Sequence, residues 1–138
     1  MRRIKAFFSS PLCLIWIAPF VLMSPVLVPG KAMFWGTPML QFVPWWTQAS
    51  RILAQGQLPL WNPLVGMGAP LLANYQSALL YPPTWTYLLL GFTGGAPAIA
   101  RGLGFVAAVH FGWGGWGMAK LIRRLGWGQL AQTVSGLA

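Results

Sequence analysis

The sequence of 138 residues carries nine cations and neither aspartate nor glutamate, so its formal net charge is +9. Hydrophobic residues make up 57% and charged residues 7%, with a mean hydropathy of +0.62, which is typical of a membrane protein rather than a soluble domain. The lack of carboxylates excludes a general base, a nucleophile or a hard-metal ligand of that type from this chain acting alone. We therefore expect no metal site and no cofactor.

The cations gather at the two ends of the chain. Arg2, Arg3 and Lys5 precede the first hydrophobic stretch, and Lys120, Arg123 and Arg124 follow the last one. This distribution predicts that both ends lie on the cytoplasmic side of a membrane. Attraction to anionic headgroups accounts for both clusters. A single-strand nucleic-acid site is the alternative, but it would place its cations between the aromatic residues, so no nucleic-acid partner is expected.

The first apolar stretch runs over residues 11–28, which just suffices to cross a bilayer as a helix. Pro19 and Pro25 predict a kinked span. A cleaved signal peptide is the alternative because the arginine-rich start fits one, although Gly30-Lys31-Ala32 is a poor cleavage site. Cys13, the only cysteine, is interpreted as a small packing residue.

A long external loop is expected over residues 30–97. Its prolines forbid one continuous helix, and no charged residue lies between Arg51 and Arg101. A soluble loop of that length would normally carry charge, so this one is expected to fold against the membrane face. Met33-Phe34-Trp35 at its start reads as an aromatic anchor at the interface.

One helix within this loop is expected from Pro44 to Gly56, a glycine suited to a left-handed stop. It should lie in the membrane plane, packed against protein. The predicted apolar stripe is Trp45, Ala49, Ile52 and Leu53, with Thr47, Gln48, Arg51 and Gln55 on the other face. Tight turns should follow over residues 58–70. Further short helices are expected at 71–80 and 84–91, and a turn at 94–97.

The second span is expected over residues 99–121. Ala100, Gly104, Ala108 and Gly112 recur every four residues, forming a small-residue face on which another helix can pack. A cytoplasmic turn at 122–129 and an incomplete third span at 130–138 complete the prediction. The sequence thus predicts an all-α membrane protein: one N-terminal module over residues 1–138, with two transmembrane helices flanking a large external loop that contains short interfacial helices.

Neutral hydrogen-bonding residues set among aromatic rings are the candidate substrate site. Indoles beside amides suit sugar rings, which stack through C–H faces and bond through hydroxyls. The alternative is that the same amides hold an irregular backbone in place. Arg51 could bind a phosphate or a headgroup. His110 near the middle of the second span is a functional candidate or a neutral imidazole bonded to a neighbouring helix. The candidates are Gln41, Arg51, Trp61, Asn62, Asn74, Gln76, Tyr81 and His110.

Several motifs resemble the first external loop of YfhO-type bacterial membrane proteins. They are Gln41-Phe42-x-Pro44-Trp45, Leu58-Pro59-Leu60-Trp61-Asn62-Pro63, Gly66-x-Gly68-x-Pro70, Ala73-Asn74-x-Gln76 and Tyr81-Pro82-Pro83, followed by His110, Gly117-Met118 and Arg123-Arg124-Leu125-Gly126. These proteins are similar to GT-C integral membrane glycosyltransferases, which use a polyprenyl-phosphate-linked sugar at the external face. The resemblance implies a bacterial inner-membrane location with the N-terminus cytoplasmic and the loop external.

One residue departs from the family pattern. An aspartate usually stands four residues before the glutamine, where it is the expected catalytic or metal-binding group, and here that position is Thr37. The resemblance therefore implies an N-terminal fragment or truncated relative of such a glycosyltransferase, not catalytic alone and completed by further spans. The alternative is a non-catalytic subunit that packs on a polytopic membrane partner through the small-residue face.

Overall fold

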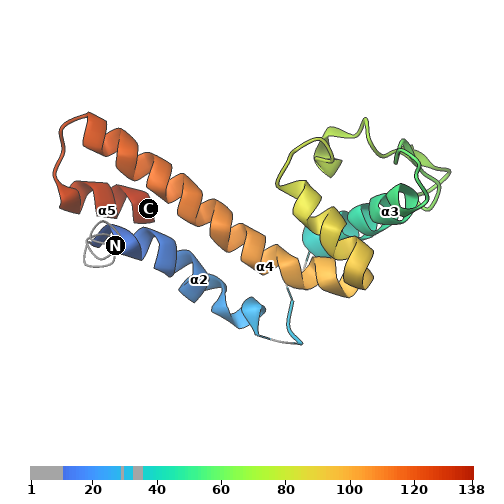
Figure 1. The fold of residues 1–138 in the computed structure, drawn as a ribbon, viewed down its shortest axis with the longest axis horizontal. Coiled ribbons are helices and arrows are strands. Elements are labelled where there is room, and N and C mark those ends of the chain that lie inside the picture. Colours follow the sequence, from blue (N-terminus) through green and yellow to red (C-terminus); the bar gives the residue numbers. More distant parts are fainter. Residues whose placement is uncertain (1–10, 29, 33–35) are drawn as a thin grey trace. The chain divides into compact units, whose positions relative to one another are not determined.

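The computed structural model describes residues 11–28, 30–32 and 36–138, and the fold is mostly helical (Figure 1). This confirms the all-α prediction at the level of secondary structure. The chain groups into two compact units: Met1–Pro25 with Phe105–Ala138, here called the helical unit, and Val26–Gly104, here called the lobe. The basic start and the aromatic anchor predicted at residues 33–35 lie outside the described residues.

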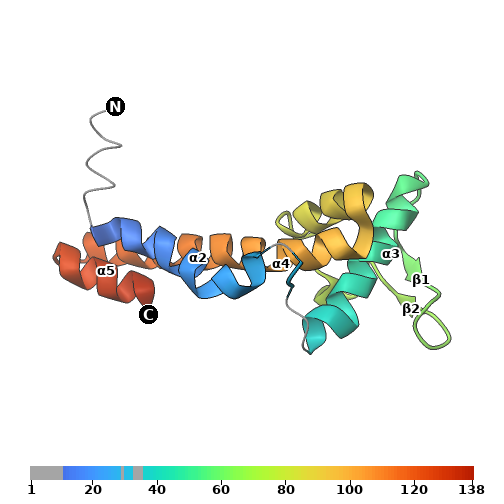
Figure 2. The same ribbon diagram turned by 90° about the horizontal axis from the view of Figure 1, so that it is seen from below.

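The first apolar stretch is helical, as predicted. A 3₁₀ turn at Pro11–Cys13 leads into helix α2 (Leu14–Leu27), which contains both Pro19 and Pro25. Within the helical unit α2 lies beside α4 (Thr84–Arg124), as both views show (Figures 1 and 2). Phe20 of α2 meets Phe105 of α4 edge to face, with ring centroids 5.8 Å apart. Apolar and aromatic contacts therefore join the two helices.

Small residues of α4 allow this close approach. Ala108 is fully buried, and a Cβ added to Gly112 would lie 2.7 Å from the Trp16 ring of α2. In the lobe, a Cβ on Gly104 would lie 2.7 Å from Val26. The small-residue face predicted to receive another helix is thus filled by the first apolar helix of the same chain.

The last helix, α5 (Gln129–Leu137), occupies most of the segment predicted to begin a third span. It packs on the Pro11–Cys13 turn. A Cβ on Gly115 of α4 would collide with the backbone carbonyl of Gly136, and Ile15 contacts the same place. Two glycines therefore let the backbones of α4 and α5 meet within the helical unit.

Helix α4 is interrupted at Gly95, whose φ of 59° and ψ of −150° are not helical. Of the turn predicted at 94–97, only Gly95 leaves the helical conformation. The helices expected at 84–91 and 99–121 form the parts of α4 before and after it. Among the described residues, α4 alone is long and apolar enough to cross a membrane, by length and composition. The apolar helix at Pro11–Leu27 is shorter.

The helix predicted from Pro44 to Gly56 is α3 (Val43–Ala54), preceded by a π-helical turn at Pro38–Phe42. Gly56, at φ 72°, ends it through bonds from its own N–H to Leu53 and from the Gln57 N–H to Ile52, the left-handed glycine stop that was predicted. The predicted faces are correct at Ala49, which is buried, and at Arg51 and Gln55, which are exposed, but wrong at Thr47. The buried residues are Val43, Trp46, Thr47, Ala49 and Ser50, so Thr47 lies on the buried side.

Between α3 and α4 the lobe is irregular. The turns predicted at 58–70 include a short antiparallel ladder, β1 (Trp61–Asn62) with β2 (Ala69–Pro70), which the sequence did not reveal. The helix predicted at 71–80 is reduced to a 3₁₀ turn at Tyr75–Ser77. Asn74 begins this turn and Ala78, at φ 49°, ends it, because hydrogen bonds local to Asn and Ser outcompete a longer helix here.

The contact between α4 and α5 predicts a difference between neighbouring glycines. Gly115→Ala should lower the stability of the helical unit by about 1–3 kcal/mol, because a backbone carbonyl cannot move aside as a side chain can. Gly117→Ala is the matched control, since a Cβ there meets nothing within 4 Å. It should be neutral or stabilising by up to ~1 kcal/mol. Thermal unfolding in micelles, followed by circular dichroism, measures both; equal midpoints would contradict the contact.

Candidate functional site

The lobe is built around the indole of Trp46. Its ring stacks on Tyr87 of α4, with centroids 4.3 Å apart and planes 6° apart, and on Phe42 at 5.3 Å and 13°. Its Nε1–H donates to the backbone carbonyl of Ser77, 2.8 Å away. One side chain thereby joins α3, the first turns of α4 and the irregular loop between them.

Ser77, whose carbonyl accepts from the Trp46 indole, also holds the loop through its side chain. The residue is fully buried, and its Oγ lies 2.8 Å from the Leu71 carbonyl oxygen and 2.7 Å from that of Asn74. A hydroxyl has one proton to donate, so the two carbonyls share it, and the buried Oγ is thereby satisfied. The hydrogen bonds that hold segment 71–77 are therefore neutral, and the buried Leu71 adds apolar packing.

A second hydroxyl joins α3 to α4. Ser50 Oγ donates to the Trp46 carbonyl within α3 at 2.8 Å and lies 3.2 Å from the Leu88 carbonyl of α4. Gly91 leaves the space for it, because a Cβ at that position would collide with Ser50 Oγ. The two helices can therefore approach only because position 91 lacks a side chain.

Two of the predicted substrate-binding amides are used inside turns. Asn62 is 3% exposed, and its Oδ1 accepts a hydrogen bond from the Leu64 N–H at 3.0 Å. Asn74 Oδ1 accepts from the Gln76 N–H at 3.0 Å. Both are local turn contacts of the kind that asparagine commonly makes. These contacts agree with the alternative that the amides hold an irregular backbone in place.

Two other predicted residues are brought together across the lobe. The Gln41 amide Nε2 donates to Gln76 Oε1 over 3.2 Å, at the surface. Thr37, which stands where the family pattern has aspartate, is exposed and lies immediately before the turn that carries Gln41. Its side chain makes no capping hydrogen bond. This corner of the lobe presents amides and a hydroxyl, which bind neutral polar groups.

The remaining lobe candidates are exposed. Trp61 is 51% exposed, and its ring covers Gly68, where an added Cβ would collide with the indole Nε1. Tyr81 is 52% exposed at the start of the segment that leads into α4. Arg51 is exposed on α3. These three side chains could meet a ligand without unfolding the lobe.

His110 lies in the helical unit, so no site shared with the lobe residues is assigned to it. Its Nδ1 is 2.8 Å from the Val106 carbonyl one turn earlier, and since a carbonyl only accepts, Nδ1 carries the proton. His110 and Ser135 are the polar residues lining a groove of about 910 Å³ between α2, α4 and α5. The imidazole thus bonds to its own helix.

Sequence reasoning missed the residues that organise the lobe: Trp46, Ser50 and Gly91. Trp46 was passed over for Trp45, although Val43, Trp46, Thr47 and Ser50 also follow helical spacing. Among the described residues no buried side-chain nitrogen or oxygen lacks a hydrogen-bond partner. One histidine, one cysteine and no carboxylate in the sequence cannot supply three metal-binding side chains.

Comparisons of the chain with protein-family models, with curated proteins and with solved structures find no match.

The hydrogen bonds of Ser77 predict a local loss of stability in the variant Ser77→Ala. The Leu71 and Asn74 carbonyls lose the hydroxyl but each keeps a backbone N–H partner, so opening of the lobe should become easier by about 0.5–1.5 kcal/mol. Amide hydrogen exchange in peptides covering residues 71–78 measures this opening. Ser24→Ala is the control, because Ser24 is exposed in α2. Exchange in the lobe that is the same in both variants would contradict the role given to Ser77.

Proposed function

We propose that this chain is an integral membrane module resembling the N-terminal part of a YfhO-type, GT-C-like glycosyltransferase of the bacterial inner membrane. In this proposal Pro11–Leu27 and the second half of α4 cross the bilayer, and the lobe is external. The observation that supports it is the hydrogen bonding inside the lobe. Residues 52–100 carry no charge, and their buried side-chain nitrogen and oxygen atoms have hydrogen-bond partners within the protein. Such a lobe can remain folded against an apolar membrane face.

The module supplies scaffold rather than catalysis. Transfer of a sugar from a polyprenyl phosphate needs a base or a metal-binding carboxylate, and the sequence contains none. Thr37 retains a hydroxyl that is not basic near neutral pH. The acidic group must therefore come from another segment or another subunit, and the corner formed by Thr37, Gln41 and Gln76 is where the family pattern would place it.

Only those candidate residues of the lobe that are exposed can contact a polyprenyl-phosphate sugar. Arg51 has the charge and the donor geometry for a phosphate. Trp61 and Tyr81 offer rings for the sugar face. Asn62 and Asn74 are held in turns by their own side chains, so in this proposal they shape the lobe and do not bind the ligand.

A non-catalytic subunit packed on a polytopic membrane partner is the second candidate function. The small residues Gly112 and Gly115 are already covered by α2 and α5, so a partner would not use that face. The observation that favours this candidate is the apolar groove of the helical unit, which exposes large side chains such as Phe111 and Leu22. A transmembrane helix of the partner would cover them. Co-purification with a polytopic protein would support this candidate.

The proposed topology predicts opposite accessibility for two engineered cysteines. In a Cys13→Ala background, Gln57→Cys in the lobe should react in intact cells with a membrane-impermeant maleimide. Gly128→Cys, between α4 and α5, should react only after the membrane is permeabilised. Both positions are exposed, and a Cβ on Gly128 meets nothing within 4 Å. The reverse pattern, or extraction of the protein by alkaline carbonate, would refute the topology.

The proposed ligand predicts different effects for two arginines. Arg51→Gln should weaken binding of a polyprenyl-phosphate sugar to the reconstituted chain by about tenfold, since a charge-assisted hydrogen bond is lost. Arg101→Gln, the control of equal charge change, should leave binding unaltered because Arg101 Nε is bonded to the Pro97 carbonyl of its own helix. Fluorescence titration measures both. Equal affinities for wild type and Arg51→Gln would remove Arg51 from the site.

A further inference from the structure

The C-terminal end of α4 concentrates positive charge on an ordered helix terminus. Gly126, at φ 83°, ends the helix. Its N–H bonds to Arg123, and the Trp127 N–H bonds to the Ile122 carbonyl, which is the Schellman pattern. Lys120, Arg123 and Arg124 are exposed in the last turns, where the partial negative charge of the helix end favours cations. The backbone thus holds three cations and Trp127 in defined positions.

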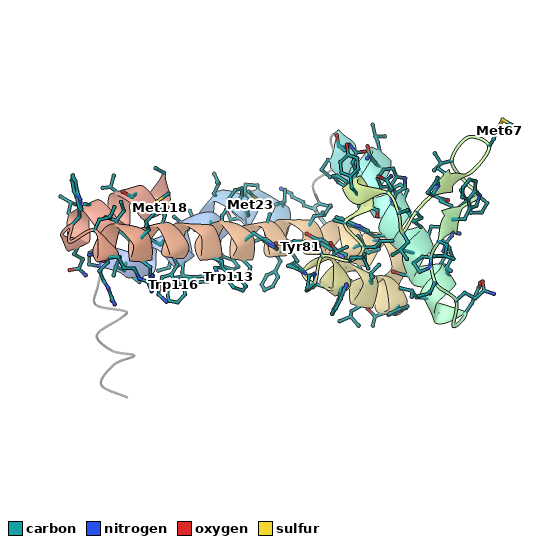
Figure 3. The ribbon with its side chains drawn as sticks, turned by 90° about the horizontal axis from the view of Figure 1, so that it is seen from above. Met23, Met67, Tyr81, Trp113, Trp116 and Met118 are labelled. Atoms are coloured by element: carbon teal, nitrogen blue, oxygen red, sulfur yellow. The ribbon has the colours of Figure 1, made fainter. Side chains whose placement is uncertain are left out.

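The cations share one face of α4 with two indoles. At about 100° per residue, the positions 113, 116, 120, 123 and 124 fall within an arc of about 100°. Figure 3 shows Trp113 and Trp116 on the same side of α4, with Met118 on the other side. Trp113 is 66% exposed. A band of aromatic rings is therefore followed along the helix by a band of positive charge.

One cation is positioned by an aromatic contact. Lys120 Nζ lies 3.6 Å from the centroid of the Trp116 ring, within the range of a cation–π interaction. Trp116 is itself placed by Trp16 of α2, with centroids 6.5 Å apart. The ammonium is therefore directed along this face by contacts within the helical unit.

No acidic side chain of the chain can neutralise these cations, because the sequence contains neither aspartate nor glutamate. Their complement must be an anion from outside. The spacing indicates which kind: along the axis, the Cα atoms of Lys120 and Arg124 lie about 6 Å and about 12 Å beyond that of Trp116, and the Lys120 ammonium lies over the Trp116 ring. Indoles sit at the headgroup level of a bilayer, so the cations reach the layer that contains lipid phosphates.

We propose that this face binds the headgroups of anionic phospholipids in preference to zwitterionic ones. Its residues are Trp113, Trp116, Lys120, Arg123, Arg124 and Trp127, here called the cationic end face. The indoles lie beside the lipid glycerol and upper chains, and the cations pair with headgroup phosphates and neutralise the net negative charge. This inference rests on the proposed membrane insertion, and it concerns bilayer lipid rather than a sugar donor.

Bromine-labelled lipids test the proposal with the full chain reconstituted in vesicles. Brominated phosphatidylglycerol or brominated phosphatidylcholine quenches tryptophan at the bilayer, and their competition gives a relative association constant. For wild type at low salt we expect a preference for phosphatidylglycerol of about fivefold for each cation engaged. The preference should be smaller in 0.5 M salt, because added salt screens charges beyond the Debye length, which is then ~3–10 Å.

Two double variants, each losing one lysine and one arginine, isolate the cationic end face. K120Q/R124Q should reduce the preference by about the factor expected for two cations, whereas K31Q/R101Q should keep it. A preference retained in full by the first variant, or reduced equally in both, overturns the inference. Quenching by brominated phosphatidylcholine that persists in all three proteins shows that insertion is intact; its absence in wild type refutes the membrane proposal itself. Trp116→Phe should give an intermediate preference, since the ring that positions Lys120 is smaller and binds cations less strongly.

Discussion

The absence of acidic side chains forces this chain to satisfy its buried polar atoms with neutral partners. A buried amide or hydroxyl without a partner costs about 1–3 kcal/mol, and here the partners are backbone carbonyls and N–H groups. Ser77 reaches two carbonyls, Ser50 lies beside carbonyls of α3 and α4, and the Trp46 indole donates to the loop. The lobe therefore depends on a few side chains that connect segments far apart in the sequence. Its exposed residues take no part in these buried hydrogen bonds, so they can contact a ligand without breaking them.

A second constraint is close backbone approach. Because Gly91 has no side chain, Ser50 can pack against it, and Gly112 likewise leaves space for the Trp16 ring. Gly115 and Gly136 allow close contact between two helix backbones. In a bilayer, helices gain little from hydrophobic burial against one another, so contact between small residues is a principal source of association. The helical unit uses this contact within one chain. That use explains why a small-residue pattern, which in isolation predicts a partner helix, is filled here by α2 and α5.

The sequence predicted those parts of the fold that depend on proline, glycine and hydropathy. The apolar helices, the stop at Gly56 and the interruption at Gly95 each follow from a local conformational limit. The buried face of α3 was predicted wrongly in part, because Thr47 was placed on the polar face and Ser50 was not assigned to the buried one. Each hydroxyl bonds to the carbonyl four residues earlier, which lowers the cost of burial. The β1–β2 ladder and the pairing of Gln41 with Gln76 could not be predicted, since both join residues whose proximity is set by the tertiary structure.

The same bonding pattern separates structural residues from those available for function. Asn62 and Asn74 have suitable chemistry for a sugar, but their side-chain oxygens are occupied by turn N–H groups. Only the amide N–H₂ group of the half-buried Asn74 could meet a ligand while its oxygen stays in the turn. Arg51, Trp61 and the cations at the end of α4 are exposed, and the sequence offers them no carboxylate. An ion pair of these cations with a lipid phosphate or with an acidic side chain must therefore involve a different molecule. The exposed cations are thus available to bind other molecules, while neutral hydrogen bonds and apolar contacts stabilise the fold.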